Sequence, residues 1–359
     1  MSGCGCSFSA AEDIKEDVKY TDELADQFAK EVGVDPRPNE TLVEIDERGA
    51  FIRQPNAFIQ PFGDEEGDLK AEAGRYGIYW ATGCNWSNRP VIVRDLLGLQ
   101  DVISDTRVTH SGETNKYGHA FGDQPGFKDP KTGAYFLSEF YKRANPDFKG
   151  RATTPTLVDI KEKKAVNNDY HRLTNYIEVQ FRPFQPKDAP DLYPKKFSKE
   201  IDEFNDWLFP HVNNGHYRMA FCQSPEAYDE AYEDFYESLE KLDKRLETNR
   251  FLFGDYITDS DVRAYVTLVR WDVSYYHNIG PVKKPIRDYK NIWGYLRELY
   301  QIPAFRHGSD PQVLALEGPK KKLGEVLFRG YNERILAKVD FEKLWADDGE
   351  RRKLSNNPD

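Results

Sequence analysis

The chain has 359 residues, of which 39% are hydrophobic and 14% aromatic, and its formal net charge at pH 7 is -11. This length fits two domains better than one. An acidic surface repels phosphate backbones, so we expect no nucleic-acid partner. No apolar run is long enough to cross a bilayer, and the first residues lack a charged and then apolar signal segment, so we expect a cytoplasmic protein without a membrane partner.

Cysteine usage points away from a disulfide-stabilised protein. The four cysteines are Cys4, Cys6, Cys84 and Cys222. This number does not form a disulfide framework in a chain of this length. The Cys4-Gly5-Cys6 sequence is either a vicinal pair, a metal clip or, as we favour, two spare thiols on a frayed terminus. His110, His119 and His171 have no metal-ligand spacing with Cys84, so we predict no metal site.

The first 73 residues read as an N-terminal arm. They are polar, acidic and interrupted by prolines, with one expected helix near residues 21–32. Phe51, Phe58, Ile59 and Phe62 indicate that the later part of the arm packs against the rest of the protein.

Residues 74–98 are the stretch around which the chain is organised. The pattern predicts a strand over Tyr76–Trp80, a short loop, and a helix from about Ser87 to Leu97, with Cys84 at the junction. The unpaired N–H groups and the dipole of a helix start lower the pKa of a thiol placed there. The motif Cys84-x-x-Ser87 favours chemistry with one cysteine, in which an external thiol resolves the intermediate. The alternative is a small buried residue after a strand.

Strands and helices alternate up to about residue 176. We expect a second strand from Asp101 to about Val108, a long loop over 110–131, a helix over 132–143 and a strand over 153–159 that begins at a proline. A proline that opens a strand at this point of a thioredoxin-like fold is the position of a cis-proline, whereas a trans proline at a sheet edge is the ordinary alternative. Asn167, Asn168 and Asp169 are candidate caps of the next helix.

The second half of the chain has a helical pattern. Four prolines between 179 and 196 mark a linker, and helices are expected over 197–209, from Ser224, from Thr258 and over 292–300. The predicted limits are an arm over 1–73, a thioredoxin-like domain over 74–182, an all-helical domain over 183–318 and a charged tail over 319–359 with one helix near 331–339. The fold class is therefore a thioredoxin-like α+β domain followed by an all-α domain.

Several sequence blocks resemble the Xi class of glutathione transferases, the glutathionyl-hydroquinone reductases. They include R-Y-x-I-Y before the Cys84 loop, V-I-V-R-x-L-x-G-L-x-D-V-I after it, Thr154-Pro155-Thr156-Leu157, Asn213-Asn214-Gly215-x-Tyr217 and Leu268-Val269-Arg270-Trp271-Asp272. The resemblance extends from about Gly74 to Phe305.

The resemblance implies a two-step thiol chemistry. Cys84 as thiolate would attack the sulfur of a glutathionyl-hydroquinone, and a second glutathione would release the mixed disulfide. Tyr217 and Tyr275 would hydrogen-bond the quinol oxygens and act as proton source, because a phenol with a pKa of about 10 is a donor at neutral pH. Without the resemblance, both tyrosines read as packing residues. The family also implies a homodimer and no cofactor besides the thiol.

The resemblance further implies a thiol-binding set, which departs from the family at three places. The set comprises Trp86, Arg89, His119, Thr154, Pro155, Asp169 and Tyr170. C-P-W-A of the family is Cys84-Asn85-Trp86-Ser87 here, G-W-x-F is Gly118-His119-Ala120-Phe121, and N-N-E-S is Asn167-Asn168-Asp169-Tyr170. The paired tyrosines near the family's C-terminus have only Tyr331 as a weak counterpart.

These departures leave other functions open. The small thiol is glutathione or another low-molecular-weight thiol such as mycothiol or bacillithiol. A second hypothesis is a non-catalytic protein that keeps the fold. A third is a conjugating transferase in which Ser87 or a tyrosine activates the thiol.

Overall fold

The computed structural model describes residues 19–35, 44–276, 283–315, 321–323, 326–328, 338–346 and 350–355. Cys4, Cys6, Tyr331 and most of the predicted tail helix lie outside these residues. The described residues form two compact units. The first combines 19–35 with 108–152, and the second combines 44–107 with the described residues from 153 onward. The predicted domain over 74–182 is shared between both units, and its limits stay a prediction.

The first unit is built around helix α1. Its elements are α1 (Asp22–Val32), β3 (Thr109–His110), β4 (His119–Ala120), η1 (Pro125–Phe127) and α3 (Leu137–Ala144). Thr21 caps α1 with its side chain, and Phe28 stacks on Tyr135 at 4.2 Å between ring centroids. The helix predicted from residue 132 begins only at Leu137, because Thr132 bonds to the Asp129 side chain and Gly133 has a left-handed φ of 79°.

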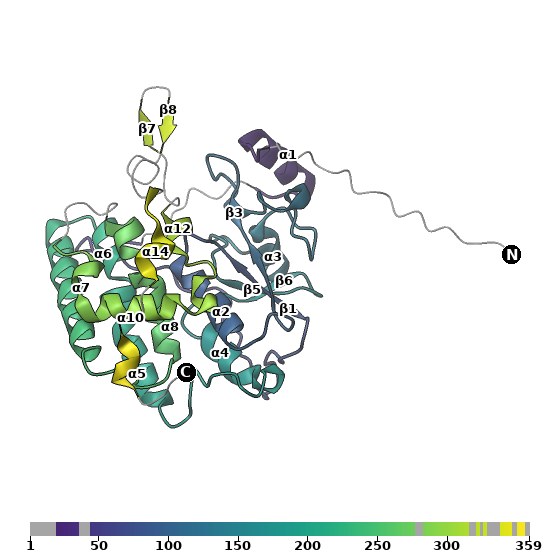
Figure 1. Ribbon diagram of the computed structural model, residues 1–359. Helices are drawn as coiled ribbons and strands as arrows, with labels where there is room; N and C mark the ends of the chain where they lie inside the picture. The colour runs from purple at the N-terminus through teal and green to yellow at the C-terminus, as the bar shows by residue number, and fades with distance from the viewer. Residues whose placement is uncertain are drawn as a thin grey trace. The chain divides into compact units, whose positions relative to one another are not determined.

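The second unit contains a mixed sheet of four strands in the order β2-β1-β5-β6. Figure 1 labels three of them, β1, β5 and β6. Its elements are β1 (Tyr76–Trp80), α2 (Asn85–Leu96), β2 (Ser104–Arg107), β5 (Thr156–Asp159), β6 (Lys164–Asn167), α4 (Leu173–Gln180) and η2 (Arg182–Phe184). β1 and β2 are parallel, whereas β5 and β6 continue the sheet antiparallel. A βαβ unit followed by a hairpin is the thioredoxin-like arrangement that the sequence predicts.

Helix α2 is buried on all sides. A helix that covers one face of a sheet usually exposes its other side to solvent. Every residue from Asn85 to Arg94 is buried. The reason is position, because α2 packs on β1 and α4 on one side and on α8 (Asp259–Leu268) and α11 (Pro303–Arg306) on the other. The helix start that carries Cys84 is therefore held between the sheet and the helical half of the unit.

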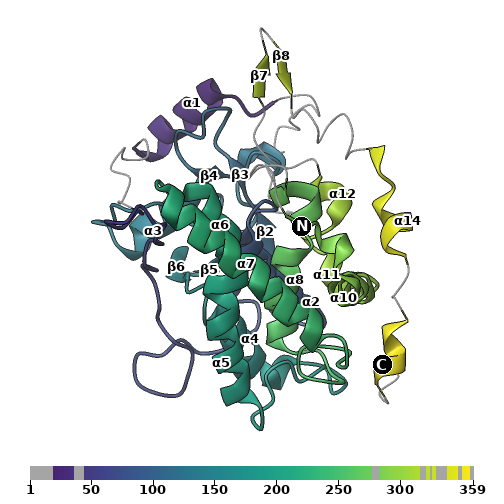
Figure 2. The same ribbon diagram turned by 90° about the vertical axis from the view of Figure 1, so that its left-hand side faces the viewer.

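From residue 198 onward, the elements of the second unit within the described residues are helices apart from one short hairpin (Figure 2). Its remaining elements are α5 (Ser198–Leu208), η3 (Phe209–Asn213), α6 (Gly215–Phe221), α7 (Pro225–Arg245), η4 (Trp271–Tyr275), η5 (Ile286–Asp288), α10 (Lys290–Tyr300), α12 (Pro311–Leu314), β7 (Lys321–Leu323), β8 (Val326–Phe328), α14 (Phe341–Trp345) and η7 (Arg351–Leu354). The predicted caps are confirmed, since Ser224 caps α7 and Thr258 caps α8.

Residues 44–73 of the arm belong to the second unit and form a strap that is attached to the rest of this unit. Near its start, Gly49 O accepts from Gln223 N at 2.7 Å, and Arg48 O accepts from Ser224 Oγ at 2.7 Å. Gly49 has a φ of 82°, and a Cβ there would lie 3.0 Å from Ser224, so the close approach requires glycine. Further along, Phe58 exchanges hydrogen bonds with Asn168.

The end of the strap joins the core. Phe62 is buried, with its ring 5.3 Å from that of Tyr76 and 5.5 Å from that of Phe181. The predicted packing of the arm is confirmed at Phe62, whereas Ile59 is exposed.

We expect Ser224→Ala to lower the free energy of unfolding by about 1 kcal/mol. The substitution removes the oxygen that accepts from Ala227 N at the start of α7 and the hydroxyl that donates to the strap at Arg48 O. Urea unfolding measures the change, with Ser224→Thr as the control that keeps the hydroxyl. An unchanged midpoint for Ser224→Ala would contradict the assigned cap.

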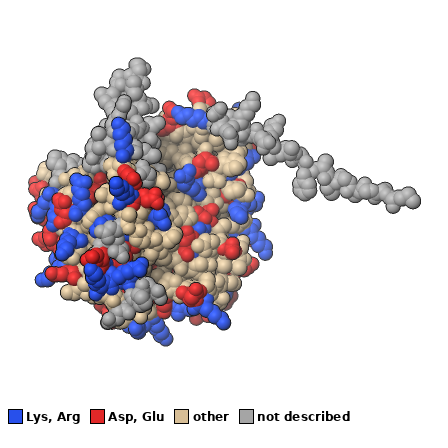
Figure 3. Space-filling view, in the orientation of Figure 1, with Lys and Arg blue, Asp and Glu red and all other residues tan. Residues whose placement is uncertain are grey.

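On the face drawn in Figure 3, basic and acidic side chains are interspersed. Among the described residues on that face, they do not form a basic stripe of the kind that binds nucleic acid. No helix within the described ranges has the length and apolar character needed to span a bilayer.

Candidate active site

Cys84 is the N-cap residue of α2. Its backbone is extended, with φ −100° and ψ 103°, and its Sγ lies 3.4 Å from Thr154 O. Thr154 precedes Pro155 across a cis peptide bond at the start of β5, so the protein has the cis form of the two alternatives that the sequence left open. The side chain is half-buried, and Cys84 is a free cysteine. A thiol in this position is accessible to a small partner and lies at the positive end of a helix dipole.

Ser87 holds the loop around Cys84 in shape. It is fully buried, and its Oγ bonds to Ala81 N, Ala81 O and Cys84 O at 3.0–3.1 Å. With these partners the hydroxyl is a structural brace. It is not placed to activate a bound thiol, which weighs against the conjugating hypothesis based on Ser87.

Two tyrosine hydroxyls face the Cys84 loop from the helical half. Tyr217 OH lies 3.4 Å from Tyr275 OH and 3.5 Å from the Asn85 side-chain oxygen. Burial raises the pKa of Tyr217, and the nearby Cys84 sulfur raises it further. Burial also raises the pKa of Tyr275 well above its usual value. Both phenols therefore remain protonated and able to donate at neutral pH.

Asn85, which stands where the family has a proline, connects these groups. Its side-chain amide is buried and donates to Thr267 Oγ1 of α8 at 3.1 Å, while its oxygen faces Tyr217. The residue that replaces the family proline thus joins the cysteine loop to the tyrosines.

Trp86 is buried between two arginines. The guanidinium carbons of Arg53 and Arg89 each lie 4.6 Å from the centre of its ring. Arg89 is buried, and its Nη2 donates to Asn213 Oδ1 at 2.9 Å. Burial lowers the pKa of Arg89 to about 9. The resemblance placed Arg89 in the thiol-binding set, and the structure places its side chain in the interior beside Trp86.

Asp169 and Tyr170 lie at the other side of Trp86. Asp169 Oδ1 accepts from Asn56 Nδ2 at 3.1 Å and from the backbone N–H groups of His171 and Arg172, just before α4. The predicted cap was wrong, because the N-cap residue of α4 is Arg172 and no side chain caps this helix. The ring of Tyr170 is half-buried, 5.5 Å from that of Trp86. Burial raises the pKa of Tyr170, while Arg53 and Arg89 lower it. The aromatic ring adds apolar surface where the family has a small hydroxyl.

His119 belongs to the first unit, where β4 pairs it with His110 of β3. The second unit holds the other predicted site residues. The structure therefore gathers Cys84, Trp86, Thr154, Pro155, Arg89, Asp169, Tyr170, Tyr217 and Tyr275 in one unit.

Two further residues were absent from the sequence-based set. His216 is fully buried, with its ring stacked 3.6 Å from Tyr275 and 3.7 Å from Tyr217, and burial lowers its pKa well below the usual value. Arg53 of the strap lies over Trp86 and Tyr217. The sequence feature that could have identified Arg53 is its position two residues after Phe51, in a segment expected to pack against the rest of the protein.

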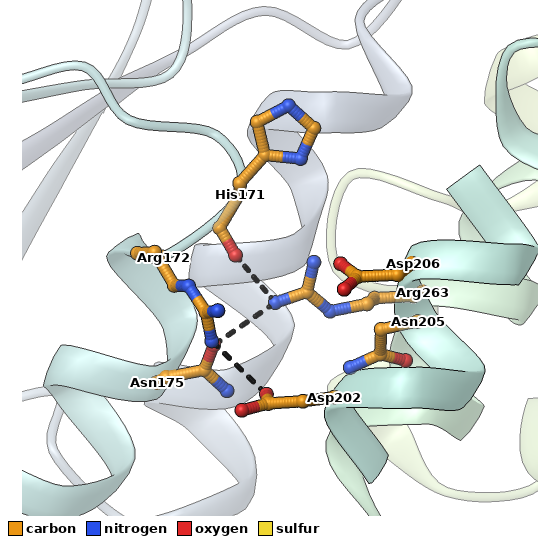
Figure 4. A pocket seen from close by; sticks show the side chains of 7 residues that line it. All are labelled: His171, Arg172, Asn175, Asp202, Asn205, Asp206 and Arg263. Atoms are coloured by element: carbon orange, nitrogen blue, oxygen red, sulfur yellow. Dashed lines mark hydrogen bonds and ion pairs between the residues drawn. The ribbon is translucent and has the colours of Figure 1, made fainter. Parts of the chain in front are cut away.

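A polar cavity of about 300 Å³ lies between α4, α5 and α8 (Figure 4). Arg263 donates to His171 O at 2.7 Å, and Arg172 pairs with Asp202 at 3.0 Å. None of the predicted site residues lines this cavity.

Within the described ranges, no group of three or more His, Cys, Asp or Glu side chains is arranged to hold a metal ion. The expectation of no metal site stays a prediction.

A thioredoxin-like sheet, a cysteine at the start of its first helix and an all-helical half define a cysteine-type glutathione transferase. Residues 225–298 match the family model "Glutathione S-transferase, C-terminal domain". The fold class predicted from the sequence is confirmed.

Curated relatives and solved structures narrow the class. The chain is 38% identical to glutathionyl-hydroquinone reductase YqjG of Escherichia coli over 264 residues, covering 71% of this chain and 80% of the relative. It is similar to the crystal structure of glutathione S-transferase Xi from Phanerochaete chrysosporium, with a TM-score of 0.70 and 33% identity over 76% of this chain and 88% of the other. The glutathione-bound structure of YqjG has a TM-score of 0.65 at 32% identity, over 75% of this chain and 88% of the other. The chain belongs to the Xi class of glutathione transferases, the family of the glutathionyl-hydroquinone reductases.

Proposed function

We propose that this protein reduces glutathionyl-hydroquinones through a mixed disulfide on Cys84. The observation that carries the proposal is the position of Cys84: a half-buried free thiol at the N-cap of α2, facing Thr154. The relatives named glutathionyl-hydroquinone reductase support the substrate class.

The chemistry is a two-electron reduction by two thiols. The Cys84 thiolate attacks the sulfur of the conjugate, so that an S–S bond forms while the bond between sulfur and the ring carbon breaks. The ring retains the electron pair of the broken bond, and its carbon carries a proton taken from water. The hydroquinone leaves as its phenolate, which water then protonates. A second thiol molecule then attacks the mixed disulfide. The two small thiols leave joined as a disulfide, and the Cys84 thiolate is restored.

Tyr217 and Tyr275 bind the quinol oxygens in this proposal. Their raised pKa values keep both phenols protonated, so each donates a hydrogen bond to an oxygen that gains negative charge.

We expect Tyr217→Phe and Tyr275→Phe each to lower kcat/KM for the conjugate by about 10- to 100-fold. The double variant should lose less than the product of the two effects, because the hydroxyls lie 3.4 Å apart and act on one substrate. Initial rates of hydroquinone release measure both effects. Tyr256→Phe, which changes an exposed tyrosine, is the control. Wild-type rates in both single variants would contradict the assigned role.

Glutathione is the proposed thiol, supported by glutathione-bound relatives. The retained carboxylate of Asp169 fits the ammonium end of this peptide, although one oxygen already bonds to Asn56 and to His171 N just before α4. The ring of Tyr170 favours the alternative of a different low-molecular-weight thiol, such as mycothiol or bacillithiol.

The test is incubation with disulfides of several small thiols, followed by intact-protein and peptide mass spectrometry. We expect one adduct, located on Cys84, and release of hydroquinone from the matching conjugate. The absence of a Cys84 adduct with every disulfide would overturn the proposal and support the non-catalytic alternative.

We also propose a homodimer in the cytoplasm, as expected from the family resemblance and the composition. The domain limits at residues 74, 183 and 319 belong to the same proposal. Sedimentation velocity of the full chain tests the dimer.

A further inference from the structure

Arg53 lies in the strap, which is outside the thioredoxin-like and helical parts of the unit. Its side chain lies over two aromatic rings of the site. Its guanidinium carbon lies 4.6 Å from the ring centres of both Trp86 and Tyr217. Its Nε donates to Asn214 Oδ1 at 2.6 Å, which fixes the plane of the guanidinium. The strap is tied to the start of α7 through Gly49 and to β6 through Phe58, so Arg53 lies between two anchored points.

The guanidinium retains an unused donor. Arg53 Nη2 is buried and has no hydrogen-bond partner among the described residues. A buried donor without an acceptor is costly, and native proteins rarely leave one without a purpose. Arg89, beside the same tryptophan, bonds to Asn213 through Nη2, and its atom without a partner among the described residues is Nε.

The charge of Arg53 acts on the groups that surround the site. It lowers the pKa values of Tyr170 and Tyr217, against the larger opposing effect of burial. It also helps burial to lower the pKa of His216. The charge of Arg53 therefore acts on Tyr217, which is one of the two phenols assigned to the quinol oxygens.

The proposed reaction is favoured by a cation close to the quinol oxygen. A quinol conjugate reacts most easily through its keto form, in which water has delivered a proton to the ring carbon that carries sulfur. Attack of Cys84 on sulfur then breaks the bond between carbon and sulfur, and its electron pair moves through the ring to the carbonyl oxygen. The product leaves as a phenolate, whose negative charge is stabilised most by a fixed, poorly hydrated cation.

We propose that Arg53 binds the phenolate oxygen of the departing hydroquinone through Nη2, beside the hydroxyl of Tyr217. This inference rests on the proposed reductase function and adds a residue of the arm to the site.

The test compares three substrates in single turnover, each followed by formation of the Cys84 adduct. The first is a glutathionyl-hydroquinone, the second is glutathione disulfide, and the third is bis(2-hydroxyethyl) disulfide, which carries no charge. We expect Arg53→Gln to slow the conjugate by about 100-fold, as for loss of one oxyanion donor, and both disulfides by less than about threefold. Arg53→Lys should recover part of the rate with the conjugate because it restores the charge.

Arg48→Gln is the matched control, since it removes the same charge from an exposed side chain of the same strap. Binding of 4-nitrophenolate and of uncharged 4-nitroanisole provides a second measurement. Arg53→Gln should weaken only the phenolate, which a general loss of packing would not achieve.

Four results would overturn the inference. If Arg53→Gln slows all three substrates equally, Arg53 acts through packing. If it slows only the conjugate and glutathione disulfide, Arg53 binds a carboxylate of the thiol. If Arg53→Gln leaves all three rates unchanged while the wild-type protein is active, the role of Arg53 is refuted and the proposed reductase function is not. A wild-type protein that reacts with disulfides but not with the conjugate refutes the proposed reductase function, and the inference with it.

Discussion

Cys84→Ser should abolish reduction of glutathionyl-hydroquinones, with a loss of at least about 1,000-fold in kcat. A serine hydroxyl is not ionised at the N-cap of α2 near neutral pH and cannot form a mixed disulfide. The fold should be preserved, because the Cys84 side chain makes no capping hydrogen bond to α2. Hydroquinone release measured by chromatography, together with the mass of the intact protein, checks both expectations.

Cys222→Ser is the matched control for this experiment. Cys222 is also a free, half-buried cysteine, but burial raises its pKa and its Sγ donates to Met219 O at 3.2 Å. We expect full activity and an unchanged adduct in this variant. Turnover that survives in Cys84→Ser, or an adduct on Cys222, would refute the assignment of the nucleophile.

Arg270→Met should produce the largest loss of stability, about 3 kcal/mol. Arg270 is fully buried and donates to Thr82 O at 2.8 Å, Val266 O at 2.6 Å and Gly308 O at 3.3 Å. Methionine fills much of the same volume but leaves these carbonyl oxygens without this donor. Because Thr82 lies two residues before Cys84, the substitution should also loosen the catalytic loop.

Chemical unfolding followed by tryptophan fluorescence measures the loss, and amide hydrogen exchange of residues 81–88 measures the loosening of the loop. Arg182→Met is the control, since Arg182 forms an exposed pair with Asp191 at 2.8 Å that is worth less than about 1 kcal/mol. If both substitutions cost the same, Arg270 does not hold the two halves of this unit together.

Local patterns predicted much of the secondary structure. The strand at Tyr76–Trp80 and the caps at Ser224 and Thr258 are as expected. These features depend on interactions within a few residues: side-chain alternation along a strand and oxygens that satisfy the first N–H groups of a helix. The start of α3 was predicted five residues too early, because a turn at Asp129–Gly133 competes with the helical pattern.

The surroundings of Arg89 show what the same reasoning cannot reach. The resemblance placed this arginine, five residues after the cysteine, in the thiol-binding set. In the structure α2 is covered on both sides, so Arg89 is buried under Trp86 and bonded to Asn213, a residue 124 positions away. Sequence spacing indicates which residues share a helix, but not which neighbours cover that helix.

The sequence by itself determined the thioredoxin-like start, the helical second half, the cysteine at their centre and the two tyrosines that the family resemblance assigned. Tertiary structure alone decided which side chains surround that cysteine. Asn85 reaches Tyr217, and Arg53 of the strap lies over Trp86, across more than 30 residues in each case. Contacts at such separation depend on how buried surfaces pack together, and packing responds to the whole chain rather than to any local pattern.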